Sequence, residues 1–261
     1  MSIATYVLAF DQQKWMLRNL ENAYPHVDKI YIMYSKLPFN YHPKARETYI
    51  NTLDLNIIKQ SPYIDKITII EGDWLNETEE RTACVQYAKK DGIDYLMVHD
   101  ADHFYFHEGI ESIKNVLRNS PDFDIYAINV YDFWKSFKYV VVGPDGSKIT
   151  AGFQAVLNLH KVDKYVHRGK YDVAHVPYSN GAIINDVICY HGSYVLTDEE
   201  VYKKIKTYAH SGDFDGDKWY NEIWLPWTLE SKNLNPLFPD AWHHCEIFNN
   251  PLPEVIQDFD I

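Results

Sequence analysis

Cysteine is scarce in this chain, and its placement excludes two classes of protein. The three cysteines, Cys84, Cys189 and Cys245, stand far apart in a sequence of 261 residues, so neither a disulfide framework nor a cysteine metal cluster is indicated. Long apolar runs are also missing, because no stretch approaches the ~20 apolar residues that span a bilayer. The short apolar run near the N-terminus is not preceded by basic residues, as an export signal would be. We therefore expect a soluble, cytoplasmic protein with no membrane span.

Basic residues are in deficit as well. The chain has 25 Lys and Arg against 37 Asp and Glu, a formal net charge of -12, which argues against broad attraction to nucleic acid or anionic membranes. The loop at residues 167–170, with the sequence HRGK, is the one segment that offers a local basic patch. Aromatic residues are plentiful at 15% of the chain, and such rings line sugar and base sites as well as filling cores.

Strand-like and helix-like segments alternate through the first half of the chain. Apolar runs bounded by turn residues indicate strands, and Asn76 with Glu79 resembles the capping box of a helix that ends before Gly92. Such alternation predicts a mostly parallel sheet flanked by helices on both faces. The expected strands cover residues 5–10, 27–34, 64–71 and 93–99, and the first two expected helices cover residues 12–23 and 43–54.

The second half of the sequence is richer in strand patterns. We expect strands at residues 124–131, 138–142, 153–160 and 187–195, with a helix at 109–117 between the two halves. Thr197 and Glu200 form a capping box for a further helix that Gly212 closes. The segment from residue 213 to 261 has little regular pattern and many tryptophans and prolines, so we interpret it as an irregular aromatic extension packed on the domain formed by residues 1–212.

Two aspartates mark the end of the expected fourth strand. Asp100 and Asp102 follow the apolar run at residues 93–98, at the carboxyl edge where open α/β sheets bind ligands. Hard oxygen donors in this spacing suit Mg2+ or Mn2+, which in turn suit a diphosphate. The alternative is a turn in which an aspartate caps the helix that begins near Glu108.

Four local patterns together resemble the GT-A glycosyltransferases, and within them enzymes similar to glycosyltransferase family 2. They are the N-terminal strand and helix, the pair Glu80-Arg81, the sequence HDADHFY at residues 99–105, and YHGSYV at residues 190–195 ahead of a basic helix. They follow the order of that family over residues 3–212. The resemblance implies an α/β, GT-A-like (Rossmann-like nucleotide-binding) fold with a mostly parallel sheet flanked by helices and a mixed β part.

The same resemblance implies a metal-dependent transfer of sugar from a nucleotide-sugar donor, with a UDP-sugar favoured and inversion as the outcome. The metal, Mn2+ or Mg2+, would be held by Asp100, Asp102 and His191 and would bridge the diphosphate. The donor would contact Phe10, Asp11, Arg81, Asp100 and Trp134. Other interpretations remain, since His191 could be satisfied by backbone partners, Arg81 could pair with Glu77 four positions earlier, and Trp134 could belong to the core.

A catalytic base is needed if transfer inverts the anomeric centre. The resemblance points to an aspartate, and Asp186 is the first candidate, although the Glu-Asp dipeptide usual in the family is missing there. Asp132 is the second candidate. The chain departs from the family again at Tyr34-Ser35, where the family often places an aspartate against the nucleoside, so the donor stays open.

Three other functions compete with this interpretation. A nucleotidyltransferase has similar acids but normally carries a glycine-rich basic loop after the first strand, where this chain has Asp11-Gln12-Gln13-Lys14. A non-catalytic sugar-binding protein would keep the fold. Finally, a metal-dependent hydrolase could use the dense set of ligand-type residues His99, Asp100, Asp102, His103 and His107.

The acceptor of a transferase could be a glycan, a protein, a small molecule or a modified DNA base. If the chain is a metal-dependent glycosyltransferase, Asp102 is expected at an exposed sheet edge.

Overall fold

The computed structural model of the chain describes residues 1–168 and 173–259, and four parallel strands form the first half of its sheet. Three of them are buried along almost their whole length, which explains why they occur as continuous apolar runs. The predicted α/β class is therefore confirmed. These strands are β1 (Ile3–Ala9), β2 (Lys29–Ser35), β3 (Ile67–Gly72) and β4 (Tyr95–Val98), in the spatial order β3-β2-β1-β4.

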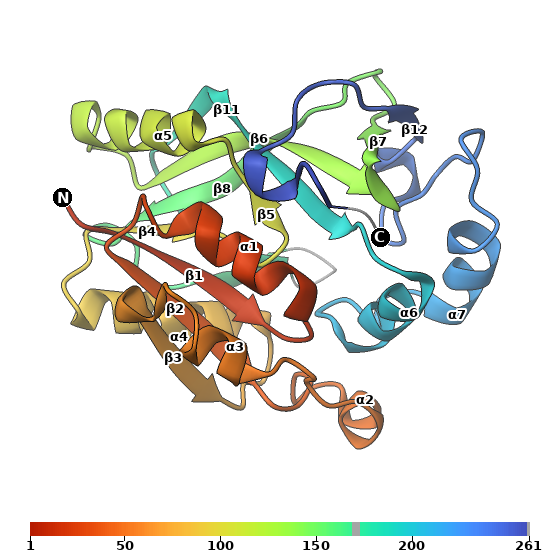
Figure 1. Ribbon diagram of the computed structural model, residues 1–261, viewed down its shortest axis with the longest axis horizontal. Helices are drawn as coiled ribbons and strands as arrows, with labels where there is room; N and C mark the ends of the chain where they lie inside the picture. Colours follow the sequence, from red (N-terminus) through yellow and green to blue (C-terminus); the bar gives the residue numbers. More distant parts are fainter. Residues whose placement is uncertain (169–172, 260–261) are drawn as a thin grey trace.

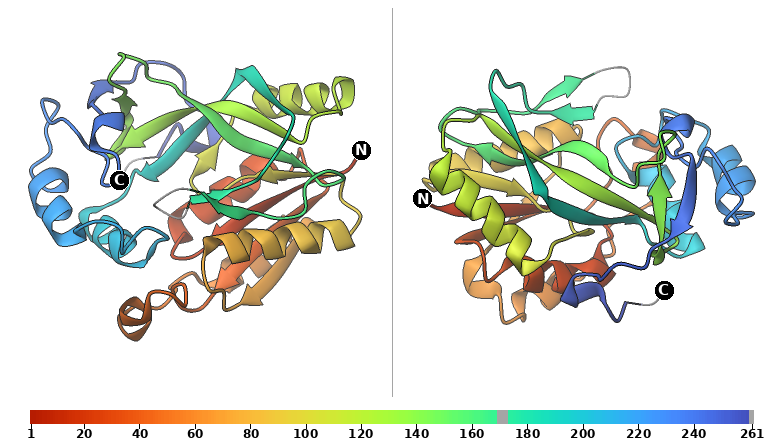
Figure 2. Two further views of the ribbon diagram at one scale, coloured as in Figure 1. Left: turned by 180° about the vertical axis from the view of Figure 1, so that it is seen from behind. Right: turned by 90° about the horizontal axis from the view of Figure 1, so that it is seen from above.

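Helices α1 (Gln13–Ala23) and α4 (Glu77–Lys90) cover opposite faces of these strands. In Figure 1, α1 lies in front of β1, and α4 comes to the front when the molecule is seen from behind in Figure 2. Alternate residues of a strand point to opposite faces of a sheet. Accordingly, Val7 of β1 belongs to the buried cluster that contains side chains of α1, and Tyr6 to the cluster that contains side chains of α4.

The second half of the sheet is mixed, as predicted. β8 runs antiparallel to β4 and to β6, β7 pairs antiparallel with β6, and β11 pairs parallel with β6. Helix α5 (His107–Asn119) packs against β11. These strands are β6 (Ile125–Trp134), β7 (Ser136–Val142), β8 (Thr150–Asn158) and β11 (Gly181–Tyr194).

A two-residue strand links the two halves at the point where the acidic pair lies. After β4 the chain turns and forms β5 (His103–Phe104), which pairs antiparallel with the end of β11. In this register His191 of β11 lies opposite His103. The sequence did not reveal β5, because a strand of two residues has no period to detect.

Local end signals explain several boundaries. The Asn76 side chain accepts a hydrogen bond from the Glu79 N–H at 2.9 Å and so caps α4 as predicted. Thr197 and Glu200 form the predicted capping box of α6 (Asp198–Thr207). These side chains satisfy N–H groups that the first turn of a helix leaves unpaired.

The single helix expected at residues 43–54 is instead two short helices, α2 (Pro43–Thr48) and α3 (Leu55–Lys59). The break has a clear cause in Asn51. Its side-chain amide donates hydrogen bonds to the carbonyl oxygens of Ala9 and Ser35, at 2.6 and 2.8 Å. The Asn51 side chain therefore ties the segment between the two helices to the carboxyl ends of β1 and β2.

The C-terminal residues are more regular than the sequence suggests. Strand β12 (His244–Ile247) pairs antiparallel with β7 and extends the sheet, so these residues form one regular element within the extension predicted to have little regular pattern. The boundary at residue 212 stays a prediction. The remaining short elements are η1 (Ile64–Lys66), β9 (Val166–Arg168), β10 (Val173–His175), α7 (Gly216–Trp219), η2 (Tyr220–Trp224), η3 (Pro239–Ala241) and η4 (Glu254–Ile256).

A partly buried histidine just after α1 bonds to α5 and makes stability depend on pH. His26 hydrogen-bonds Glu111 through Nδ1 at 2.8 Å and His107 through Nε2 at 2.6 Å. Burial lowers the pKa of His26 below its usual value of 6.5. As the pH falls below 6.5, the unfolded chain therefore takes up a proton at this position before the folded chain does, and unfolding becomes easier.

We expect His26→Gln to reduce this acid sensitivity. In urea unfolding at pH 7.5, 6.5 and 5.5, the free energy of unfolding of the wild type should fall more steeply with acidification than that of the variant, by at most about 1.4 kcal/mol per pH unit. Identical slopes for the two proteins would show that His26 has the same pKa in the folded and unfolded chains.

Candidate active site

A cavity of about 640 Å³ opens at the carboxyl edge of the parallel strands. Its floor contains residues that follow β1, including the predicted donor contacts Phe10 and Asp11, and residues that follow β4, including Asp100 and Asp102. Helix α6 closes the opposite side. The acidic pair therefore does lie at the mouth of the fourth strand, where open α/β sheets bind their ligands.

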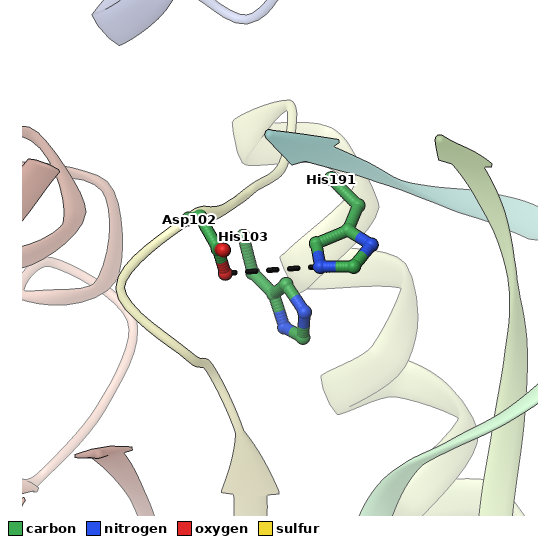
Figure 3. A group of neighbouring side chains, drawn as sticks. All are labelled: Asp102, His103 and His191. Atoms are coloured by element: carbon green, nitrogen blue, oxygen red, sulfur yellow. Dashed lines mark ion pairs between the residues drawn. The ribbon is translucent and has the colours of Figure 1, made fainter. Parts of the chain in front are cut away.

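Asp102, His103 and His191 come together beside this cavity (Figure 3). Each offers one ligand-type atom, and these three atoms all lie within 4.8 Å of one another. The Asp102 Oδ1 and His191 Nε2 atoms are 3.8 Å apart. The β5–β11 pairing creates the group, since it places the two histidines, 88 positions apart in sequence by their numbers, on opposite residues of one ladder. Among the described residues this is the one group of its kind.

The donor atoms of this group fit a divalent metal ion such as Mn2+. The Asp102 Oδ1 atom lies 3.8 Å from His191 Nε2, and Oδ2 lies 3.8 Å from Lys204 Nζ. Both distances are too long for a hydrogen bond. The buried His103 Nδ1 has no hydrogen-bond partner among the described residues, and buried nitrogens normally have one. A carboxylate oxygen beside imidazole nitrogens is a set that borderline metals accept.

The charge states of Asp102 and His103 suit metal binding. At His191, burial opposes the charged form, but the hydrogen bond with Asp132 outweighs it and raises the pKa, so a metal would have to displace a proton from this ring. Burial lowers the pKa of His103 to about 4, so its ring is neutral at pH 7 and keeps a lone pair. Burial opposes the charged form of Asp102, but the positive charges of His191 and Lys204 outweigh it and lower the pKa of this carboxyl. Asp102 is therefore an anion at neutral pH. It is 7% exposed, so the expectation of an exposed sheet edge is wrong, although the residue does line the cavity.

Asp132, the second candidate base, is placed behind His191 rather than in the cavity. Its Oδ1 hydrogen-bonds His191 Nδ1 at 2.8 Å, and its Oδ2 accepts a hydrogen bond from Thr150 at 2.9 Å. Asp132 is not among the residues that line the cavity. A carboxylate in this position fixes the ring and leaves Nε2 free to face the cavity, as the outer partners of metal-binding histidines do.

We expect Asp132→Asn to weaken metal binding by about 10- to 100-fold while the protein stays folded. Calorimetric titration of the variant with Mn2+ measures this directly. Asp186→Asn is the matched control and should bind Mn2+ like the wild type. Equal affinity for the Asp132 variant and the wild type would show that the hydrogen bond does not orient the imidazole.

Asp100 is engaged by Arg81 and does not belong to the group of three. The guanidinium donates to both carboxylate oxygens, at 2.7 and 3.2 Å, a two-point pairing that is strong and directional. Arg81 also donates to Glu77 at 2.7 Å, as the alternative interpretation of this residue expected, and to the Tyr6 hydroxyl at 2.6 Å. The group of three in the structure therefore contains His103, whereas the sequence prediction contained Asp100.

Three lysines line the cavity and were missed as individual residues by the sequence interpretation. Lys14 lies at the start of α1, and Lys203 and Lys204 lie on α6. Lys203 contacts Asp11 at 2.7 Å, and Lys14 contacts Glu200 at 2.6 Å, so each pair joins α6 to the segment after β1. The available signal was the basic character of the helix after residue 195.

Comparisons with known proteins find likeness in structure only. No protein-family model matches the sequence, and no curated protein matches it. The chain is similar to the crystal structure of S. aureus TarS 1-349, at 11% identity and a TM-score of 0.45, over 73% of this chain and 60% of that one. HddC from Yersinia pseudotuberculosis is similar at 13% identity and a TM-score of 0.40, over 74% of this chain and 94% of that one.

A longer TarS structure is similar at 9% identity and a TM-score of 0.45, and it covers 78% of this chain but 38% of its own length. This chain thus spans less than two thirds of either TarS structure. Likeness at these levels concerns the arrangement of strands and helices alone. What the cavity does must follow from its own side chains.

Two predicted site residues lie elsewhere. Asp186 lies in the irregular stretch of β11 between Ile184 and Ile188, where its carboxylate accepts a hydrogen bond from Ser112 of α5 at 2.8 Å. It does not line the cavity, so it cannot take a proton from a ligand there. Trp134 is 0% exposed in an aromatic cluster with Tyr194 and is likewise not available to stack on a sugar.

The residues expected for a hydrolase are divided among different surroundings. His99 is fully buried, and its Nε2 lies 2.9 Å from the His103 carbonyl oxygen, while His107 binds His26 between α1 and α5. Only part of the dense cluster therefore reaches the cavity.

Of the basic loop at residues 167–170, Gly169 and Lys170 lie outside the described residues. None of the described helices combines the length and apolar character that a membrane crossing requires.

Proposed function

We propose that this chain is a metal-dependent glycosyltransferase that uses a nucleotide-sugar donor, with a UDP-sugar favoured. One observation carries the proposal: a cavity at the sheet edge is lined by Asp102, His191 and three lysines, and His103 lies next to the first two. The diphosphate of a nucleotide sugar can be bound by a metal ion together with lysine side chains. Its sugar and base require a pocket of considerable volume.

Asp102, His103 and His191 would hold the metal, Mn2+ or Mg2+. When bound, this ion would stabilise the negative charge of the departing nucleoside diphosphate. The protein supplies the rest. Lys204 is fixed by hydrogen bonds from its Nζ to the Ser193 carbonyl and hydroxyl oxygens, both at 2.7 Å. Because this cation is already held in place, little energy is needed to reorient it when negative charge develops on a phosphate oxygen.

Lys14 and Lys203 are suited to bind the diphosphate of the donor before the reaction begins. Both are paired with carboxylates on the cavity wall, so an arriving diphosphate would exchange one anionic partner for another. The cavity therefore keeps its lysines compensated in the absence of a ligand, which limits the cost of placing them close together.

Donor turnover tests the proposal. Purified protein is incubated with a panel of nucleotide sugars, with Mn2+ or with EDTA, and the released nucleoside diphosphate is measured. We expect release from one class of donor with Mn2+ and none with EDTA. No release from any donor, together with no binding of nucleoside diphosphates, would contradict the proposal.

One observation favours a nucleotidyltransferase as a second candidate. Lys14 faces the cavity from the segment after β1, where that class of enzyme holds phosphate groups, although the segment has no glycine. The same protein is therefore incubated with nucleoside triphosphates and sugar 1-phosphates. Release of pyrophosphate in this reaction, without donor turnover, would assign the second function.

We expect Lys204→Met to lower kcat about a hundredfold with the donor that turns over, because it removes a fixed cation at the cavity. Lys206→Met is a matched control on the same helix, since Lys206 pairs with Asp217 at 2.7 Å and does not line the cavity. Steady-state kinetics of both variants gives the comparison. Equal kcat values for the two variants would mean that Lys204 has no special part in transfer.

A further inference from the structure

Glu80 is the one buried acid in the cavity wall that the proposed mechanism leaves without a task. It lies on α4, is 4% exposed and lines the cavity. Its neighbours on the same wall are all engaged, since Arg81 holds both Glu77 and Asp100. Among the described residues, no side chain or backbone group hydrogen-bonds the Glu80 carboxyl. Because Glu80 lines the cavity and has no hydrogen-bond partner in the described part of the protein, its carboxyl is available to a ligand there.

The position of Glu80 decides which part of a nucleotide it can meet. The lysines line the cavity from α1 and α6, whereas Glu80 lies beside the carboxylates of Glu77 and Asp100 on the α4 side. Arg81 balances one of these two carboxylates, and the negative charge that remains disfavours a diphosphate at this wall. The phosphates therefore belong with the lysines and the metal group, and an uncharged part of the ligand belongs with Glu80.

An apolar segment of the cavity lining lies next to the start of α4. The segment after β2 contributes Leu37, Pro38 and Phe39 to the lining. This segment is hydrogen-bonded to the residues just before α4, from the Asn40 N–H to the Trp74 carbonyl at 3.1 Å and from the Tyr41 N–H to the Leu75 carbonyl at 3.3 Å. An apolar surface beside one polar group is typical of sites that bind a heterocycle.

We propose that Glu80 hydrogen-bonds the base of the nucleotide and sets which nucleotide the cavity prefers. This inference rests on the proposed function, because it assumes that a nucleotide occupies the cavity. Burial raises the pKa of Glu80 well above its usual value, and the nearby Arg81 offsets this only in part. A neutral carboxyl offers one donor and one acceptor side by side, which matches an N–H next to a carbonyl on a base such as uracil.

Calorimetric titration with UDP, GDP, ADP, CDP and inorganic pyrophosphate, all with Mn2+, tests the inference. Glu80→Leu removes both polar atoms and keeps most of the volume, while Glu80→Gln keeps one donor and one acceptor. Glu79→Gln is the control on the same helix, because Glu79 is exposed and accepts a hydrogen bond from the Leu75 backbone. Thermal unfolding without ligand shows that each variant is folded.

We expect the wild type to prefer one of the four nucleotides. Glu80→Leu should bind that nucleotide about tenfold more weakly and lose the preference, while pyrophosphate affinity stays unchanged. Glu80→Gln should stay within about threefold of the wild type. A wild type without preference, or a Glu80→Leu variant with unchanged nucleotide affinities, would overturn the inference, as would an equal loss for nucleotides and pyrophosphate. A wild type that binds neither nucleotides nor pyrophosphate would overturn the proposed function itself.

Discussion

Asp102→Asn is expected to lower sugar transfer by about a thousandfold or more, because a neutral amide is a poor ligand for a hard cation and the leaving diphosphate loses its strongest charge stabilisation. The substitution keeps the side-chain volume. The Asp102 carboxylate lies 3.8 Å from His191 and from Lys204, so no hydrogen bond to either is lost. The fold should therefore remain. Donor turnover at saturating Mn2+ and thermal unfolding of the variant measure the two effects separately.

Asp100→Asn gives the comparison that decides which acid matters more. Since Arg81 occupies both oxygens of Asp100, we expect this variant to bind Mn2+ with nearly the wild-type affinity, whereas Asp102→Asn should not. The reverse ranking would restore the ligand set that the sequence alone suggested.

Trp134→Ala is expected to lower the free energy of unfolding by about 3–5 kcal/mol, the usual cost of removing a large buried ring. Trp134 is 0% exposed, and its ring lies 4.9 Å from that of Trp224 and 5.3 Å from that of Tyr194, measured between ring centres. Denaturant unfolding measures the loss. Donor KM, where the variant is still folded, should stay close to that of the wild type.

Leu225→Ala is a suitable control in the same region. Leu225 is 47% exposed, so its truncation should change stability by no more than about 0.5 kcal/mol. A Trp134→Ala protein of nearly wild-type stability with a much higher donor KM would instead support the sugar-stacking role that the sequence suggested for this residue.

The residues that the sequence located best are those whose position depends on neighbours in the chain. The strand before Asp100 is a short apolar run, and the caps at Asn76 and Thr197 each accept a hydrogen bond from the backbone N–H three positions later. Local patterns of this kind can be read directly from a sequence. The placement of the acidic pair at the sheet edge was predictable for the same reason.

The residues that were misplaced depend on contacts between distant segments. His103 joins the group at Asp102 only because β5 pairs with β11, and Asp186 turns toward Ser112 only because β11 is irregular at that point. Trp134 shows a different difficulty, since a strand pattern does not distinguish a half-buried ring from one that a later segment covers. The order of motifs along the chain contains none of this information.

Crystals grown with Mn2+ and UDP and measured at a wavelength where manganese scatters anomalously test the central claim most directly. We expect an anomalous peak within coordination distance of Asp102, His103 and His191, with the diphosphate between that peak and Lys204. A peak bound to Asp100 and not to either histidine, or UDP bound in the cavity without any peak, would contradict it.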